Sequence, residues 1–226
     1  MISIRALSKT YGKNTVLSGV TLNIQKGEVH GIVGRNGSGK TTFFRCLVDL
    51  ETCKGCVETK SGQTLKNMTG YLPTNPPILS KITGLEYLRL LCAARRLNFD
   101  PATYENIFDL PLNKYIETYS TGMVKKLAVS GILLQRNEVF VLDEPFNGLD
   151  YQSCIIVTEL IRKMKAAGKT LLISSHLFST LKDACDYIHY FDGGVITKTA
   201  DKTSFDTIEA ILHKELIGDK LKNLNF

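Results

Sequence analysis

The segment EVHGIVGRNGSGKTTFF, residues 28–44, decides the fold that we expect for this chain. Its apolar beginning (28–34) is typical of a short buried strand, and residues 39–50 are predicted to form a helix. Between them, GRNGSGKT (34–41) matches the pattern G-x-x-x-x-G-K-[ST] of a loop that binds nucleotide phosphates. Because this pattern stands between a strand and a helix, as phosphate binding requires, it predicts a nucleoside triphosphate site.

Each residue type in this loop suits phosphate binding. Glycines let the backbone curl, so that its amide hydrogens point inward at the β- and γ-phosphates. Lys40 supplies a cation, and the Thr41 hydroxyl is a ligand for Mg²⁺. The loop residues that we expect to contact the nucleotide or its metal are Gly34, Asn36, Gly37, Ser38, Gly39, Lys40, Thr41 and Thr42.

Two acidic residues follow a second apolar strand in EVFVLDEP (138–145). Ligands of open α/β sheets bind at the carboxyl ends of the strands, which is where Asp143 and Glu144 are expected. We predict that Asp143 holds Mg²⁺ through water and that Glu144 polarises an attacking water as a general base. An exposed strand end is the simpler alternative, but a phosphate loop about a hundred residues upstream favours the metal and base roles.

A third apolar strand, TLLIS (170–174), is followed closely by His176. A histidine at such a place is most often a helix cap or a surface residue. Because this strand is a candidate parallel neighbour of the Asp143 strand, its end falls beside the γ-phosphate, and we predict that His176 senses that phosphate.

The stretch YSTGMVKKL (119–127) has two interpretations. Taken alone it is a polar turn that runs into an amphipathic helix, which Ser120 caps and which buries Val124, Leu127 and Ala128. In the second interpretation, Ser120 also reaches a phosphate bound to another molecule, and these nine residues alone do not decide between the two.

The pattern along the whole chain predicts an α/β fold. Residues 1–30 alternate apolar and polar positions, as antiparallel strands do, and residues 54–72 contain further short strands. The remaining helices are predicted at 83–97, 100–110, 121–135, 152–167, 177–185 and near 205–216, with strands at 138–142 and 170–174 and a hairpin around 192–194. Alternating helices and apolar strands indicate a parallel sheet covered on both faces.

We therefore predict a P-loop NTPase core with a mainly parallel sheet, an N-terminal antiparallel β-subdomain and an inserted helical subdomain. Residues 1–72 and 125–226 are assigned to the nucleotide-binding core, with the β-subdomain near 1–30. Residues 73–124 are assigned to the helical subdomain.

Composition narrows the function. The chain has 226 residues, 43% of them hydrophobic, and a formal net charge of +6. That charge fits a protein that handles polyphosphate or faces anionic lipid, and it is too small and scattered to indicate nucleic acid. No apolar run approaches the roughly 18–20 residues of a membrane span, and we expect a cytosolic protein. The CKGC pair, Cys53 and Cys56, is interpreted as a loop entering a strand, not as a zinc or redox site.

Taken together, the phosphate loop, YSTGM, VLDEP, NGLD (147–150) and SSH resemble ATP-binding cassette (ABC) proteins in order and spacing, over nearly the whole chain. In that family a signature serine and its helix N-terminus cap the γ-phosphate of ATP held by the partner subunit, so the resemblance gives this role to Ser120 and Gly122. It also implies that Tyr11 stacks on adenine and that Asp150 contacts the opposite phosphate loop across a dimer.

Two features depart from the family pattern. The signature of this chain has Tyr119 and Thr121 where leucine and glycine are usual. Where the family has glutamine or glutamate near the metal, this chain has Thr74, with Asn75 as the alternative.

The resemblance implies the ATP-hydrolysing subunit of an ABC transporter, with ATP and Mg²⁺ as cofactors. We expect it to form a homodimer, or a heterodimer with another cassette, around two ATP molecules. We place it at the cytoplasmic face of the cell membrane, where it drives separately encoded membrane subunits, and the TYSTGM signature leans toward export.

Two rival functions are weighed against a transporter subunit. A cassette ATPase that acts on ribosomes or DNA usually has two cassettes or a coiled coil. A P-loop kinase for a small molecule would not need Ser120, Glu144 and His176 together.

Overall fold

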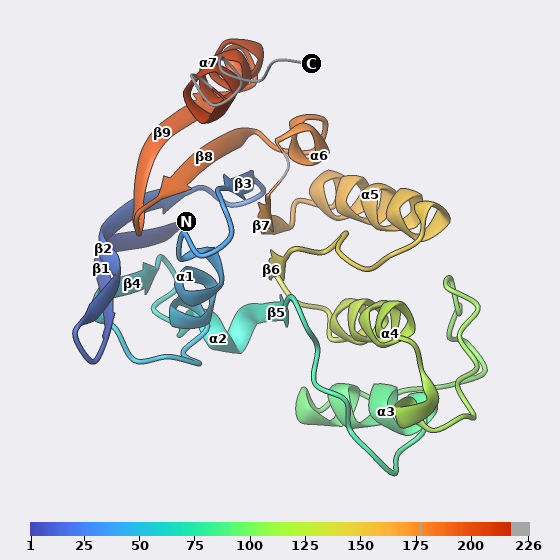
Figure 1. Ribbon diagram of the computed structural model, residues 1–226. Helices are drawn as coiled ribbons and strands as arrows, with labels where there is room; N and C mark the ends of the chain where they lie inside the picture. The colour runs from blue at the N-terminus through green and yellow to red at the C-terminus, as the bar shows by residue number, and fades with distance from the viewer. Residues whose placement is uncertain (177, 218–226) are drawn as a thin grey trace, which may run out of the picture.

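The computed structural model describes residues 1–176 and 178–217, and of residues 212–217 the backbone alone. Two sheets organise the described chain (Figure 1). The first is a three-stranded antiparallel sheet in the order β2-β1-β4. Its strands are β1 (Ile2–Tyr11), β2 (Asn14–Ile24) and β4 (Lys54–Thr59).

The second sheet has six strands in the order β5-β6-β7-β3-β8-β9. The first five of these strands pair in parallel, and β9 pairs antiparallel with β8. The strands are β3 (Val29–Val33), β5 (Thr69–Leu72), β6 (Val139–Asp143), β7 (Thr170–Ser175), β8 (Tyr187–Asp192) and β9 (Val195–Asp201). The predicted α/β class, with an N-terminal antiparallel sheet and a mainly parallel second sheet, is confirmed.

Helices cover both faces of the six-stranded sheet. In Figure 1, α1 lies between the two sheets, and α4 and α5 lie on the opposite side. The helices are α1 (Lys40–Leu47), α2 (Leu65–Met68), α3 (Gly84–Ala94), α4 (Thr121–Leu134), α5 (Tyr151–Ala166), α6 (Ser179–Lys182) and α7 (Phe205–Ile217), with a 3₁₀ turn, η1, at Ile116–Thr118.

Two hydrophobic cores lie on the two faces of this sheet, because side chains along a strand alternate. In β6, Val139 and Val141 pack with α1 and the antiparallel sheet, whereas Phe140 and Leu142 pack with α4 and α5. Burial of the whole strand on both sides fixes where its last residue, Asp143, emerges.

Side-chain caps begin α3 and α4, and the second of them, Ser120, was predicted from sequence. Thr83 and Glu86 form a reciprocal capping box at the start of α3. The hydroxyl of Ser120 accepts a hydrogen bond from the Met123 backbone at 3.2 Å and begins α4.

Two predicted helices are wrong or too long. Residues 100–110 form turns, because the Asn106 side chain bonds both backbone groups of Leu110, at 2.8 and 3.1 Å, and so replaces helical bonding there. The helix predicted at 177–185 is too long, because α6 ends at Lys182. By Asp186 the chain already bonds to β3: the Asp186 amide donates to the Val29 carbonyl, and its carboxylate accepts from the Val29 amide. Residue 177 lies outside the described residues.

The domain division stays a proposal. α4 is one continuous helix across residue 124 and contacts both α3 and β5, so a boundary there divides an element that belongs to both parts.

Candidate active site

A cavity of about 490 Å³ opens where β3, β6 and β7 end at their carboxyl ends. That volume lies within the range of small-molecule sites. The residues that line it are Val16, Asn36, Gly37, Gly39, Lys40, Thr41, Thr42, Thr74, Glu144, Asn147 and His176. Eight of these were predicted from sequence to contact the nucleotide, its metal or the attacking water: Asn36, Gly37, Gly39, Lys40, Thr41, Thr42, Glu144 and His176.

The glycines of the phosphate loop have specific reasons to be glycine. Gly37 and Gly39 adopt φ of 83° and 106°, a region that side chains rarely enter. A side chain at Gly34 would clash with the Phe191 carbonyl of β8. The Ser38 hydroxyl is buried and has no hydrogen-bond partner in the part of the chain that the structure describes. A buried polar atom without a partner in such a loop fits a ligand with acceptor oxygens.

Lys40 is a buried cation at the floor of this cavity. Its Nζ donates to the carbonyl of Gly34 at 2.7 Å and lies 3.7 Å from a carboxylate oxygen of Glu144. Only 7% of the residue is exposed, so its interactions are weakly screened by water. The loop therefore places a buried positive charge at this cavity.

The carboxylate of Asp143 accepts hydrogen bonds from three hydroxyl groups in different parts of the chain. Thr41 from α1 and Thr74 from the segment after β5 both donate to its Oδ2, each at 2.7 Å. Ser174 from β7 donates to its Oδ1 at 2.5 Å. A carboxylate beside a threonine hydroxyl fits Mg²⁺. This ion prefers oxygen ligands, takes only a few of them from the protein and fills the remaining positions with water or phosphate oxygens. Of the two alternatives near the metal, Thr74 lines this cavity, whereas Asn75 lines a different groove.

Glu144 faces the same cavity with an unusual backbone. Its φ is 49°, which is uncommon for a residue other than glycine. One carboxylate oxygen lies 2.9 Å from Nδ1 of His176, and the other faces Lys40. The structure thus brings together the predicted metal ligand, base and histidine.

Of the residues predicted outside the phosphate loop and the acidic pair, four do not line the cavity of this subunit. Ser120 is exposed at the start of α4, and Gly122 packs against the Gly148 carbonyl. Asp150 caps α5 and pairs with Lys126 at 2.8 Å, and this contact, followed by the bonds from Ser153, lowers the pKa of its carboxyl. Tyr11 ends β1, half exposed, with the Lys9 ammonium 4.6 Å from the centre of its ring.

Sequence reasoning missed two residues whose side chains hydrogen-bond to the acidic pair. Ser174 bonds both Asp143 and the Glu144 backbone, and its place one strand away could have been found from the strand-end rule. Lys125 donates to the Glu144 carbonyl at 2.7 Å, and no sequence signal distinguishes it from a surface lysine.

The family model described as "ABC transporter" matches residues 17–147, more than half of the chain. The chain belongs to the ABC transporter family. It is an ATP-binding ATPase subunit of that family, which confirms the family, function and enzyme class predicted from sequence.

Similar proteins cover nearly the whole ABC subunit. The lantibiotic transport ATP-binding protein SrtF of Streptococcus pyogenes is 26% identical over 97% of this chain and 99% of its own. The Nod factor export ATP-binding protein I of Ralstonia nicotianae is 31% identical over 86% of this chain and 65% of its own. A solved structure of an ATP-binding subunit of an ABC transporter superposes with a TM-score of 0.79 at 25% identity, over 94% of this chain and 93% of that one.

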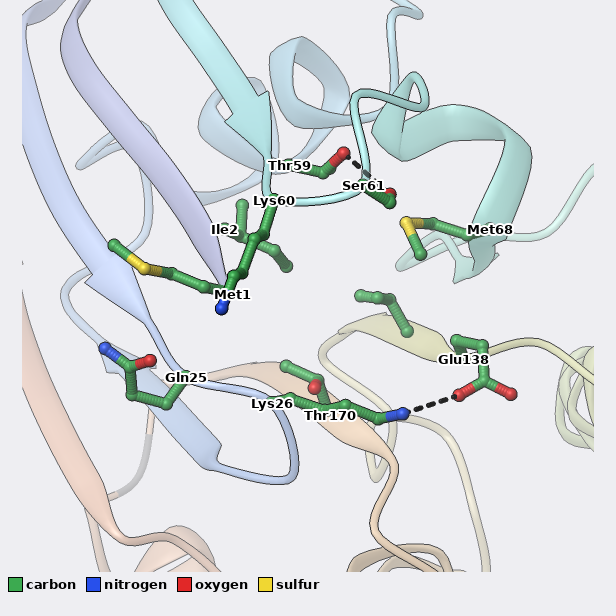
Figure 2. Close-up of a pocket in the computed structure, with 11 residues that line it drawn as sticks. Met1, Ile2, Gln25, Lys26, Thr59, Lys60, Ser61, Met68, Glu138 and Thr170 are labelled. Carbon is green, nitrogen blue, oxygen red and sulfur yellow. Dashed lines mark hydrogen bonds and ion pairs between the residues drawn. The ribbon is translucent and has the colours of Figure 1, made fainter.

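A second cavity of this ABC subunit, about 550 Å³, lies at the amino ends of β6 and β7 (Figure 2). Its one drawn ion pair joins Lys26 to Glu138 at 3.9 Å, and both side chains are largely exposed. The cysteines of the CKGC pair are exposed free thiols, and within the described residues no group of three or more metal-binding side chains gathers. Among the described helices, none has the length and apolar character needed to cross a bilayer.

Proposed function

We propose that this subunit hydrolyses Mg²⁺-bound ATP in the cavity beside the phosphate loop, with Glu144 as general base. The observation that carries the proposal is the convergence of Lys40, Asp143, Glu144 and His176 at one cavity edge. Amides of the phosphate loop and Lys40 hold the β- and γ-phosphates. Glu144 accepts the proton of the attacking water, and His176, hydrogen-bonded to that carboxylate, fixes its orientation.

Thr41 and Asp143 are the residues that hold Mg²⁺ in this proposal. When bound, the ion neutralises charge on the phosphate oxygens. Thr74 orients the Asp143 carboxylate through its hydroxyl, a task for which threonine is long enough. Tyr11 stacks on adenine, for which its exposed ring at the end of β1 is accessible.

Two cassettes close head to tail around two ATP molecules in this proposal. Ser120 and Gly122 stand at the exposed beginning of α4, a fourteen-residue helix, and neither lines the cavity of its own subunit. The N-terminus of a helix favours a phosphate. In this proposal that phosphate is the γ-phosphate of the ATP held by the second cassette. Asp150, at the beginning of α5, meets the opposite phosphate loop.

Separately encoded membrane subunits dock on a groove between the core and α3 in this proposal. The groove, of about 560 Å³, is lined by Pro76, Pro77, Tyr87 and Leu91 among others. Large apolar side chains are exposed beside or near it, and these are Leu50, Ile78, Leu79 and Leu90. Exposed apolar patches mark interaction sites, which supports peripheral attachment at the cytoplasmic face of the membrane. The likeness to a Nod factor export protein supports export as the direction.

The test of this function uses Glu144→Gln, which removes the base but preserves size. Hydrolysis should fall by roughly 10²–10⁴-fold, the range for loss of a general base. ATP then remains bound and holds two subunits together, which light scattering measures as a dimer.

The second variant places Ser120→Arg in the Glu144→Gln background. A bulky cation between α4 and the γ-phosphate of the partner should abolish the dimer, while ATP binding to monomers persists. Ser120→Thr, which keeps the hydroxyl, is the matched control and should retain the dimer. A dimer that survives Ser120→Arg would show that YSTGM only caps a helix.

A further inference from the structure

A buried lysine of α4 reaches the backbone of Glu144. Lys125 is 2% exposed, and its Nζ donates to the Glu144 carbonyl at 2.7 Å. The lysine stands five residues after Ser120, so a single helix contains both the exposed cap and this internal contact.

The hydrogen bond from Lys125 stabilises a strained backbone conformation at Glu144. Glu144 holds a positive φ of 49°, and such conformations persist only where the surroundings over-determine them. Its amide donates to the Ser174 hydroxyl at 2.9 Å, and its carbonyl accepts from Lys125 and, at 3.2 Å, from the Asn147 amide. Side chains from β7 and α4 therefore hold the peptide groups on both sides of the Glu144 Cα.

The charge of Lys125 also has a cost and a partner. Burial lowers the pKa of its ammonium, while the nearby carboxylates of Glu144 and Asp143 oppose that shift. An apolar side chain of similar volume would pack in such a place without desolvating a charge. A cation that only filled space here would therefore be a poor choice.

Two further contacts join α4 to the same loop. Gly122 leaves no room for a side chain beside the Gly148 carbonyl, and Lys126 pairs with Asp150. The segment from Glu144 to Asp150 is thus held by α4 at both of its ends.

We propose that Lys125 is a positioning residue, which fixes the Glu144 carboxylate for hydrolysis and couples it to the placement of α4. The inference rests on the proposed role of Glu144 as the base. It assigns Lys125 to the rate of the chemical step and not to ATP binding, because Lys125 lies outside the residues that line the cavity.

The experiment compares Lys125→Met with Lys163→Met, an exposed lysine of α5, in the full chain. Lys125→Met should reduce kcat by roughly 10–100-fold, the effect of losing one charged hydrogen bond that acts through the base. KM and the equilibrium affinity for ATP should stay within about twofold, since the phosphate loop is untouched. Lys163→Met should leave all three unchanged.

A double-mutant cycle separates positioning from a general structural role. In the Glu144→Gln background, adding Lys125→Met should change the residual single-turnover rate by less than about twofold, because the group it positions is already gone. A further tenfold loss in that background, or a parallel loss of ATP affinity, would overturn the proposal. Glu144→Gln alone reports separately whether Glu144 is the base.

A second pair of variants covers the case in which Lys125→Met does not fold. Lys125→Arg keeps a long cationic donor, and Lys125→Gln has a shorter neutral one. The proposal requires a kcat for Lys125→Arg at least about tenfold above that of Lys125→Gln, and equal rates would contradict it.

Discussion

Each end of β6 and β7 has a lysine–glutamate pair beside a cavity, but the pair is buried at the carboxyl ends and exposed at the amino ends. At the carboxyl ends, Lys40 lies 3.7 Å from Glu144, with 7% and 11% of the side chains exposed. At the amino ends, Lys26 lies 3.9 Å from Glu138, with 77% and 49% exposed. Each pair borders a cavity of similar size, about 490 Å³ and about 550 Å³.

The comparison shows that neither cavity volume nor an ion pair identifies the site. Exposed pairs are screened by water and contribute little, whereas buried charges interact strongly with any ligand that reaches them. At the carboxyl ends, Asp143 also accepts from three hydroxyl groups, and Lys40 donates to a carbonyl of the phosphate loop. Convergence of buried charges is what distinguishes the end proposed to be catalytic from the other.

The largest effect on ATP affinity is expected from removal of the buried cation, Lys40. Lys40→Met should weaken ATP binding by roughly 100-fold or more, since it removes the charged donor from the phosphate loop. Equilibrium titration with a fluorescent ATP analogue measures this affinity. An unchanged affinity would mean that the buried Lys40 matters no more for ATP binding than the exposed Lys26.

A smaller effect is expected from the Thr74 hydroxyl, which donates to Asp143, the carboxylate proposed to hold Mg²⁺. Thr74→Val preserves shape and should reduce ATPase activity at limiting Mg²⁺ by roughly 3–10-fold, the value of one hydrogen bond. Activity as a function of Mg²⁺ concentration measures it, and Thr74→Ser should restore most of the rate. If Thr74→Val and wild type need the same Mg²⁺, Thr74 does not act through Asp143.

The smallest effect is expected at the exposed end. Lys26→Met should leave ATP affinity and kcat within about twofold, and the free energy of unfolding within about 0.5 kcal/mol, as for most surface substitutions. The same titration and a denaturant melt test this. A large loss of activity would mean that the cavity in Figure 2 has a function of its own.

Sequence patterns predicted the parts of the site that follow from periodicity and strand ends. Apolar runs locate β3, β6 and β7, and the ends of parallel strands meet at one edge of their sheet. Lys40, Asp143 and Glu144 could therefore be placed together from the order of residues alone. The turns at 100–110 could not be predicted, because one Asn106 side chain replaces the helical bonds of Leu110.

The role of Lys125 was also beyond sequence reasoning. In an amphipathic helix a lysine is ordinarily on the solvated face, and only the tertiary packing of α4 against the Glu144 loop buries it. Thr74 was a recognised departure, yet its hydrogen bond to Asp143 depends on the path of the chain after β5.

The continuity of α4 has a consequence for cooperativity between the two halves of a closed pair. Ser120 at its beginning and Lys125 five residues later are only about 7.5 Å apart along the axis, at 1.5 Å per residue. In the proposed head-to-tail pair, Ser120 contacts the nucleotide of the neighbour while Lys125 holds the base of its own subunit. In that arrangement, occupancy of one site biases the turnover of the other. A rigid stretch shorter than two helical turns suffices to make two active sites behave as one unit.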